Sequence, residues 1–404
     1  ATVSNSNSTD APLPNTTTPI SSSRIVNITT DTMKVQIDLE GGDIVSAKLS
    51  DYSVSIDQPD QPFEILSPKR SQLFIAQSGF TASQQSDKRS SRPRFSASAE
   101  SYNIDANQLN ADVLEIPLTW SDEAGITVQK IYRFKRGSYL IDVEQKVSNQ
   151  RSTVWSGHFF GQLKRVAPEE ESGFFGARSF TGAVFSTKDN LYQKVSFDEI
   201  ESGDFGRQEN KGGWLAMIQH YFLAAWVPGQ DEQVTYYTNK GSNSGLIAGF
   251  FTPAVSVQPG TAAAFTQQLF VGPKLADRLE SIAPSLERTV DYGYLFFLAE
   301  PMFWVMKQIE SVVGNWGVAI ILLTLMIKLA FFKLSEKSYK SMANMRKLAP
   351  KMKQLKDRYG DDKQKLNQAM MEMYKKEKVN PLGGCLPIVV QMPFFIALYW
   401  MLLE

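Results

Sequence analysis

The spacing of hydrophobic residues divides the chain into a part rich in strands and a part rich in helices. From about Arg24, apolar residues alternate with polar ones, beginning with Met33, Val35, Ile37 and Leu39. This period of two predicts a strand with one buried face, and Gly41-Gly42 predicts a turn into a return strand. Similar runs follow at Leu114–Trp120, Ile126–Phe134, Tyr139–Val147, Phe222–Val227 and Phe265–Val271. Because turn residues separate these runs and long helical patterns do not, the sequence favours an antiparallel β-sandwich over a parallel α/β sheet.

After Pro273 the hydrophobic spacing changes to three and four residues, which is typical of helices. The stretch from Tyr292 to Val313 is rich in aromatic residues but contains Glu300, Lys307 and Glu310, which make it too polar to span a membrane. We expect an amphipathic helix that lies along the membrane surface. Packing of this helix on the β domain is the alternative. The candidate interfacial anchors are Tyr294, Phe296, Phe303, Trp304 and Trp316.

Two apolar runs have the length of transmembrane helices. Gly317–Phe332 is apolar except for Thr324 and Lys328, and Trp316 and Lys333 flank it as interfacial residues do. Leu386–Leu403 contains Gln391 as its only strongly polar side chain. We therefore predict two spans.

A helical hairpin is predicted between the two spans. Gly360 fits the end of its first arm, and Asp361 or Asp362 fits the cap of the second. From residue 333 to residue 380 there are 14 Lys and Arg against 6 Asp and Glu, a net charge of +8. Such a basic segment between two spans is kept in the cytoplasm. Its methionines offer an adaptable apolar surface or an ordinary helix–helix seam, and include Met342, Met345, Met352, Met370 and Met371.

Lys328 is the most informative polar residue of the predicted spans. A charge in a spanning helix usually marks a polar pathway. However, Lys328 is five residues from Lys333, about 7.5 Å along a helix, so a lysine can also snorkel to the boundary. Thr324 lies on the same face one turn earlier, and Gln391 in the second span also needs a polar partner. Together the three residues predict a polar surface within the membrane.

Several other functions are disfavoured by what the sequence lacks. We find no Gly-rich phosphate loop and no cluster of metal ligands, so we expect no cofactor. Cys385 is the only cysteine, which excludes an intrachain disulfide. Acid–base chemistry of a sugar-converting enzyme needs a histidine with a carboxylate, and His158 and His220 lie in no motif of that kind. We expect both histidines to be structural, and we expect the basic stretch Gln84–Arg94 to be a solvated loop.

Several motifs resemble those of the YidC/Oxa/Alb membrane protein insertases. They run from Gly360 to Gln364, from Tyr374 to Cys385 and from Gln391 to Phe394, with further matches at Val290–Tyr294 and Gly314–Gly317. In the β domain, Gly161–Lys164 and Lys211–Trp214 are similar to motifs of the Gram-negative members. The resemblance extends from about residue 24 to the end of the chain.

This resemblance implies a multi-domain membrane protein with a periplasmic antiparallel β-supersandwich similar to galactose mutarotase, and an α-helical membrane core. The expected parts are a flexible linker at 1–23, the sandwich at 24–287, an interfacial helix at 288–313, a transmembrane helix at 314–333, a cytoplasmic hairpin at 334–380 and a second transmembrane helix at 384–404. The family core has further helices, so we expect this chain to lack the first and the last three transmembrane helices of its family. The missing C-terminal helices would then be partners.

The resemblance also implies a function and partners, in the inner membrane of a Gram-negative bacterium. Family members are not enzymes but insertases and chaperones that pass hydrophilic segments through a positively charged groove, alone or with the Sec translocon. Lys328 matches the family's positive groove residue, usually Arg, and Thr324 and Gln391 match groove-facing positions. This match favours the pathway over snorkelling. The implied partners are nascent membrane proteins, the Sec translocon with its accessory subunits, the ribosome, the signal recognition particle receptor and membrane lipids.

Overall fold

A computed structural model of the protein describes residues 24–82, 92–105, 112–168, 180–241, 244–360, 362–377 and 386–403. The linker expected at residues 1–23 and most of the loop expected at Gln84–Arg94 lie outside these ranges. The chain divides into two compact units, Ala1–Val290 and Asp291–Glu404. Each unit is described by itself.

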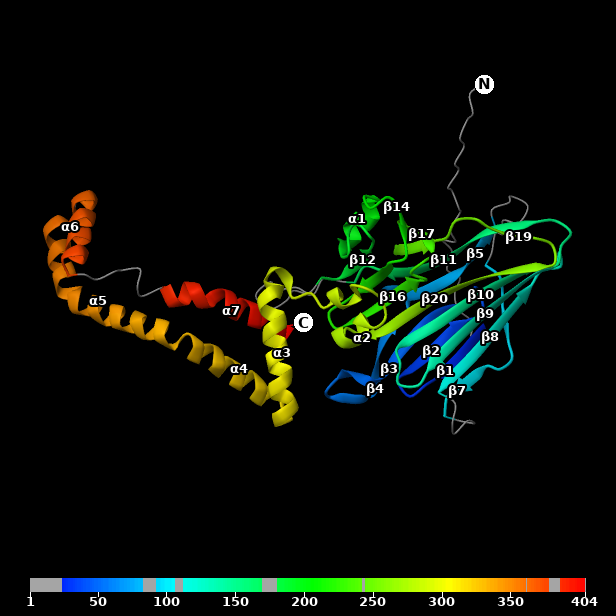
Figure 1. Cartoon of the computed structure of the whole chain (residues 1–404), viewed down its shortest axis with the longest axis horizontal. Helices are drawn as coiled ribbons and strands as arrows, with labels where there is room; N and C mark the ends of the chain where they lie inside the picture. Colours follow the sequence, from blue (N-terminus) through cyan, green and yellow to red (C-terminus); the bar gives the residue numbers. More distant parts are fainter. Residues whose placement is uncertain are drawn as a thin grey trace, which may run out of the picture. The chain divides into compact units, whose positions relative to one another are not determined.

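The first unit is a β-sandwich of two large sheets, as the alternating pattern predicts (Figure 1). One sheet has the order β14 (Arg207–Lys211), β17 (Gln233–Lys240), β18 (Gly245–Phe251), β11 (Trp155–Val166), β5 (Phe74–Ala82), β3 (Asp43–Ser55), β2 (Met33–Asp38), β1 (Ile25–Thr29) and β7 (Ser101–Asn103), with β19 (Val255–Val257) on β11 and β4 (Gln58–Leu66) on β3. The other has the order β13 (Gln193–Val195), β12 (Gly182–Ser186), β15 (Trp214–Ile218), β16 (Phe222–Pro228), β20 (Thr261–Pro273), β10 (Leu140–Asn149), β9 (Ile126–Lys135), β8 (Val113–Ser121) and β6 (Ser96–Ala97).

Strand pairing in the described part of both sheets is antiparallel, apart from the short parallel pair of β1 and β7. The predicted strands are confirmed with small shifts at their ends, and the turn between β2 and β3 falls at Gly41-Gly42. Both glycines adopt positive φ angles, of 84° and 61°, which residues with a side chain rarely adopt. The paired glycines therefore predicted the position of this turn correctly.

One hydrophobic core fills the space between the two sheets. It contains residues from both layers, such as Val35 of the first sheet and Ile141 of the second. Trp214 and Trp226 are completely buried, and their indole N–H groups donate to the carbonyl oxygens of Pro284 and Gln162, at 2.9 and 3.1 Å. Such partners are needed because a buried indole N–H without an acceptor is destabilising.

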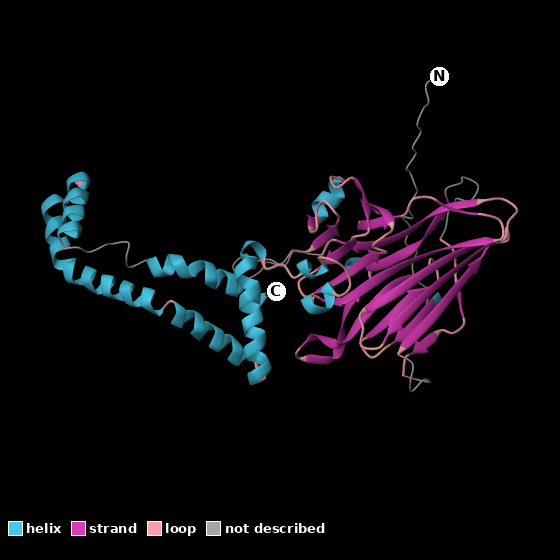
Figure 2. Ribbon diagram, viewed as in Figure 1, coloured by secondary structure: helices cyan, strands magenta, loops and turns pink. Residues whose placement is uncertain are grey.

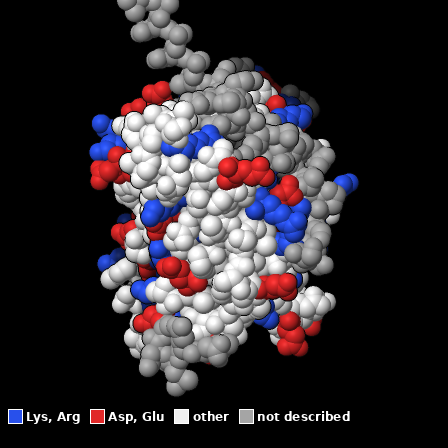
Figure 3. Space-filling model, turned by 90° about the vertical axis from the view of Figure 1, so that its right-hand side faces the viewer, with Lys and Arg blue, Asp and Glu red and all other residues white. Residues whose placement is uncertain are grey.

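Short helices, cyan in Figure 2, lie between or after some of the strands. Helix α1 (Phe197–Ser202) starts with a capping box, in which Ser196 and Glu199 exchange side-chain-to-backbone hydrogen bonds. After the last strand follow α2 (Ala276–Glu280) and the short 3₁₀ helix η5 (Leu286–Thr289); another 3₁₀ turn, η2 (Arg70–Gln72), precedes β5. Basic and acidic side chains are interspersed over the face of the sandwich seen in Figure 3, so neither charge sign dominates that view.

The second unit is helical. It contains η6 (Gly293–Leu295), α3 (Phe296–Val313), α4 (Trp316–Ala330), α5 (Phe332–Tyr359), α6 (Lys363–Lys376) and α7 (Leu386–Leu403). Helix α3 packs against α4 and α7, while α5 packs against α6. Among the described residues, α7 alone is long and apolar enough to cross a membrane by itself, and α4 and α5 qualify only together, as a pair bent by 62°.

The break between α4 and α5 differs from the expectation of one uninterrupted span. Helix α4 has 15 residues, which corresponds to about 22 Å, whereas a bilayer core is about 30 Å thick. The helix stops at Phe331, where φ is −93° and ψ is 7°. The sequence contains no Gly or Pro at this point, so it gave no signal for the break.

Candidate functional site

The candidate site lies on α4, α5 and α7 of the helical unit. Helix α4 begins at a conventional cap, because the side chain of Asn315 accepts a hydrogen bond from the backbone N–H of Val318 at 3.1 Å. Lys328 then falls in the last turn of α4, three residues before the break at Phe331. A cation is favourable at this position because the carbonyl end of a helix is partially negative.

Lys328 reaches from α4 to α7. Its Nζ lies 4.9 Å from the centre of the Phe395 ring. A cation at this distance from an aromatic face is attracted by the ring quadrupole. The contact brings the predicted charge next to the helix that carries Gln391, but through an aromatic residue that the sequence analysis did not single out. An aromatic residue in an apolar run gives no sequence signal for such a role.

Gln391 is buried, with 8% of its surface exposed, and its amide Nε2 lies 3.3 Å from Ser335 Oγ of α5. The polar partner that the sequence required for Gln391 is therefore Ser335. Gln391 and Phe395 are one helical turn apart and lie on the same face of α7. Side chains of α4 and α5 thus contact the same face of α7, through Phe395 and Gln391.

Thr324 lies one turn before Lys328, on the same face of α4. Its hydroxyl donates to the carbonyl oxygen of Ile320 in its own helix, at 2.8 Å. The hydroxyl contributes polarity to this face, and its hydrogen bond stays within α4. That the three residues form one polar surface stays a prediction, because the contacts join Lys328 and Gln391 to Phe395 and Ser335 and not to Thr324.

The methionines of the hairpin fall into two groups. Met342 and Met371 are exposed, whereas Met345, Met352 and Met370 are half-buried. Two contacts hold the arms together: the Tyr374 hydroxyl lies 3.6 Å from Met352 Sδ, and Lys351 pairs with Glu377 at 2.6 Å. Asp362 caps α6 by accepting from the N–H of Lys365 at 3.1 Å, as one of the two predicted caps. The alternative of a helix–helix seam therefore fits Met352.

The predicted interfacial anchors are mostly exposed. Tyr294 is fully exposed, and Phe296, Trp304 and Trp316 are each exposed to about half or more. Phe303 is half-buried and stacks on Trp316, with ring centres 6.4 Å apart. The opposite side of α3 is buried through Ala299, Met302 and Met306. The helix therefore has one packed face and one aromatic face, and its location at a membrane surface stays a prediction.

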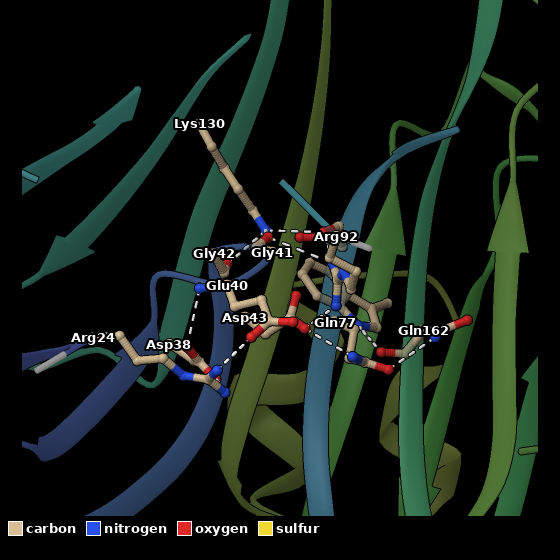
Figure 4. Close-up of polar contacts among 12 residues, drawn as sticks. Arg24, Asp38, Glu40, Gly41, Gly42, Asp43, Gln77, Arg92, Lys130 and Gln162 are labelled. Atoms are coloured by element: carbon tan, nitrogen blue, oxygen red, sulfur yellow. Dashed lines mark hydrogen bonds and ion pairs between the residues drawn. The ribbon is translucent and has the colours of Figure 1, made fainter. Parts of the chain in front are cut away.

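A buried polar network crosses one sheet of the sandwich (Figure 4). The Tyr237 hydroxyl donates to Gln162 Oε1 at 2.5 Å, Gln162 Nε2 to Gln77 Oε1 at 2.9 Å, and Gln77 Nε2 to Asp43 Oδ2 at 2.8 Å. This series of hydrogen bonds ends on the Asp43 carboxylate. Because a carboxylate only accepts, it fixes the direction of every hydrogen bond in the series. Arg92 pairs with the same carboxylate.

Arg92 departs from the expectation of a solvated loop at Gln84–Arg94, most of which lies outside the described residues. Arg94 is exposed as expected, but Arg92 is half-buried, pairs with Asp43 and donates to the carbonyl oxygen of Ser78 at 3.0 Å. The reason is that the buried Asp43 carboxylate needs a cation. A basic residue at the end of a polar stretch cannot be assigned to such a partner from the sequence.

Lys130 is the second cation of this region (Figure 4). Its Nζ donates to the carbonyl oxygens of Gly42 at 2.7 Å, Ser78 at 3.0 Å and Gly41 at 3.2 Å. Burial lowers the pKa of Lys130 to about 7, with Asp43 opposing and Arg92 adding to this shift. The network ties the Gly41-Gly42 turn to β5 and β9, and we interpret it as structural.

The two histidines give no support to a sugar-converting enzyme. His158 Nδ1 lies 2.8 Å from the carbonyl oxygen of Thr252, and its ring packs edge-on against Phe251. His220 stacks on Tyr221. In the described part of the chain, no group of three or more His, Cys, Asp or Glu could hold a metal ion.

Comparison with known proteins covers both units. A family model described as the YidC periplasmic domain matches residues 25–305, and one described as 60Kd inner membrane protein matches residues 308–404. The membrane protein insertase YidC of Nitrosococcus oceani is 48% identical over 400 residues, covering 98% of this chain and 72% of the relative. That of Methylococcus capsulatus is 47% identical over 386 residues, covering 95% and 69%.

Part of the chain also aligns with solved structures of low sequence identity. A galactose mutarotase-like protein from Lactobacillus casei aligns with a TM-score of 0.39 and 10% sequence identity, covering 61% of this chain and 99% of that one. The curated relatives are membrane protein insertases, and the second family model describes an inner membrane protein. Because these matches extend over nearly the whole chain at close to half identity, the chain belongs to the family of YidC membrane protein insertases, which are inner membrane proteins with a periplasmic domain.

Proposed function

We propose that α4, α5 and α7 form part of a positively charged groove that receives hydrophilic segments of nascent membrane proteins. The observation that supports this proposal most is the position of the Lys328 ammonium, which lies on the same face of α7 as the buried Gln391 amide. Thr324 adds a hydroxyl to the same face of α4. The groove would open to the cytoplasm and to lipid and would be closed on the periplasmic side.

The groove would act by lowering the free energy of moving polar groups into the bilayer. Each backbone polar group left without a partner in hydrocarbon costs several kcal/mol. A segment in the groove would instead meet Lys328 and Gln391, and its acidic residues would be attracted by the lysine. The apolar part of the substrate would then leave along α7 into lipid.

Lysine at position 328 restricts what the charge can do. Arginine, which is more usual at the matching position of the family, offers a planar fork that binds a carboxylate through two hydrogen bonds. Lysine provides a point charge on a flexible stem. We therefore propose that Lys328 acts through its charge, and that Lys328→Arg preserves insertion.

The remaining elements would organise substrates and partners. The basic hairpin of α5 and α6 would lie in the cytoplasm and contact the ribosome, the signal recognition particle receptor or anionic lipid, using exposed residues such as Met342 and Met371. Helix α3 would lie at the periplasmic surface of the membrane. Further transmembrane helices would complete the groove, and the Sec translocon and its accessory subunits would act with it on some substrates.

Photocrosslinking to a stalled nascent membrane protein tests where substrate binds. A photoreactive residue is placed at position 328 or 391 of the full-length protein in membrane vesicles. Position 326 is the matched control, because Met326 is exposed and lies about 160° around α4 from Lys328. We expect crosslinks from 328 and 391 and not from 326. Crosslinks only from the β domain would contradict the groove.

A substitution tests whether the charge of Lys328 matters. Lys328→Ala should slow the insertion of a substrate with an acidic translocated tail by at least about tenfold, because an ion pair at 4 Å in a partly polar site is worth about 4 kcal/mol. A substrate with a neutral tail serves as the control and should insert nearly normally. Undiminished insertion of the acidic tail would refute the role of the charge.

A further inference from the structure

Lys328 contacts an aromatic ring in place of a carboxylate. Its Nζ lies 4.9 Å from the ring centre of Phe395, which is half-buried on α7. Neither α4 nor α7 contains an Asp or a Glu. The groove thus holds its charge next to a neutral partner.

A neutral partner has a physical consequence that an acidic one would not have. A carboxylate next to Lys328 would cancel its charge and compete with an acidic substrate. The face of a ring attracts a cation but leaves the net charge unchanged. Lys328 near Phe395 therefore remains able to attract an acidic segment.

The contact between Lys328 and Phe395 is weak enough for a substrate carboxylate to replace the ring. A cation over a ring shifts an equilibrium by roughly 2- to 30-fold. A carboxylate 4 Å from an ammonium in a partly polar site shifts it on the order of 1,000-fold. An arriving carboxylate therefore displaces the ring, and the ring takes the ammonium back when the carboxylate has passed.

We propose that Phe395 is a positioning residue that holds the ammonium of Lys328 over α7 between rounds of insertion and gives it up to acidic residues of the substrate. Without the ring, the lysine side chain extends toward the end of α4, where it would only snorkel to the boundary. This inference rests on the proposed function of the groove and adds a residue to it.

The neighbouring residue Phe394 provides a matched control. Its ring packs edge-on against Phe331, with centres 5.0 Å apart at an angle of 68°. Two adjacent phenylalanines of α7 thus have different partners, one a cation and one a ring. A change that weakens attraction to cations should affect them differently.

Fluorinated phenylalanines test the proposal with little change in shape. One, two or three fluorines are introduced at position 395 of the full-length protein, which weakens the negative face of the ring step by step. Insertion rates are measured in vesicles for two substrates that differ only in an acidic or a neutral translocated tail. We expect the rate for the acidic tail to fall with each fluorine, by about 3- to 10-fold in total, and the rate for the neutral tail to stay constant.

Two further measurements separate positioning from a structural role. The dependence on fluorine should persist with Lys328→Arg and disappear with Lys328→Gln, because only the former retains a cation. The same series at position 394 should not distinguish the two substrates. If fluorination at 395 leaves the insertion rate of the acidic tail unchanged while Lys328→Ala still lowers it, the role of Phe395 is overturned and the proposed groove is not. If Lys328→Ala has no effect on the acidic tail, the proposed function itself fails.

Discussion

Replacing Lys130 by Met should destabilise the β-sandwich, because three buried carbonyl oxygens would each lose a hydrogen bond from a charged donor. Lys130 is 1% exposed, and its ammonium donates to the carbonyl oxygens of Gly41, Gly42 and Ser78 at 2.7–3.2 Å. Each oxygen keeps a second donor, from Arg92 or Tyr132, so the loss is that of hydrogen bonds to a charged group, about 1.5–3 kcal/mol each. Removing a buried charge offsets part of this loss. We expect a net decrease of about 2–4 kcal/mol in the free energy of unfolding near pH 7.

The pH dependence of stability should change in the same variant. Burial lowers the pKa of Lys130 to about 7, from 10.5 in the unfolded chain. Between these two values the unfolded chain keeps a proton that the folded protein has released, so the stability of the protein rises with pH across this window. The increment is at most about 1.4 kcal/mol per pH unit. Lys130→Met lacks the titrating group and should lose this increment.

The measurement is a urea series on the intact protein in detergent, at pH 7.5 and pH 9.5, with the folded β-sandwich quantified by pulse proteolysis. Lys146→Met is the matched control, since Lys146 is exposed on β10 and such substitutions usually change stability by less than about 0.5 kcal/mol. If wild type and Lys130→Met gain the same stability between the two pH values, the assignment of the titration to Lys130 is refuted.

Three other predictions follow from local geometry. Gly213→Ala should destabilise the sandwich by about 2 kcal/mol more than Gly137→Ala. Both glycines have positive φ, but a Cβ at Gly213 would lie 2.1 Å from the carbonyl oxygen of Ser186, whereas a Cβ at Gly137 meets no atom within 4 Å. Equal urea midpoints for the two variants would contradict this prediction. Asp362→Ala should destabilise the start of α6 by about 1 kcal/mol, because it removes the side chain that accepts from the Lys365 N–H. Hydrogen exchange in the first turn of α6 should become faster while exchange in α5 stays unchanged. Ser335→Ala and Gln391→Leu should show a coupling free energy of about 0.5–1.5 kcal/mol, because the two side chains are hydrogen-bonded. A double-mutant cycle on thermal stability in detergent measures this coupling. Strictly additive effects would show that the hydrogen bond contributes nothing.

The sequence determined the local structure of the chain because local structure follows from the order of polar and apolar residues. Alternation with a period of two placed β2, β9, β10 and β20, and the paired glycines placed the turn between β2 and β3. The apolar run at Leu386–Leu403 coincides with α7. The motifs that resemble the insertases identified the family, which the comparisons confirm.

Tertiary structure alone decided which polar groups meet. Arg92 pairs with Asp43 across 49 residues, and Gln391 finds Ser335 across 56. Each partner is set by the strand order or helix packing that brings distant segments together, and no pattern within either segment encodes it. The same holds for Phe395. In the sequence it is one more apolar residue of a predicted span, and only the helix packing shows that Lys328 lies over its ring. The break at Phe331 also has no local signal, because neither Gly nor Pro causes it. Hydrophobic periodicity is a property of neighbouring residues, whereas a binding surface is a property of residues that the fold brings together.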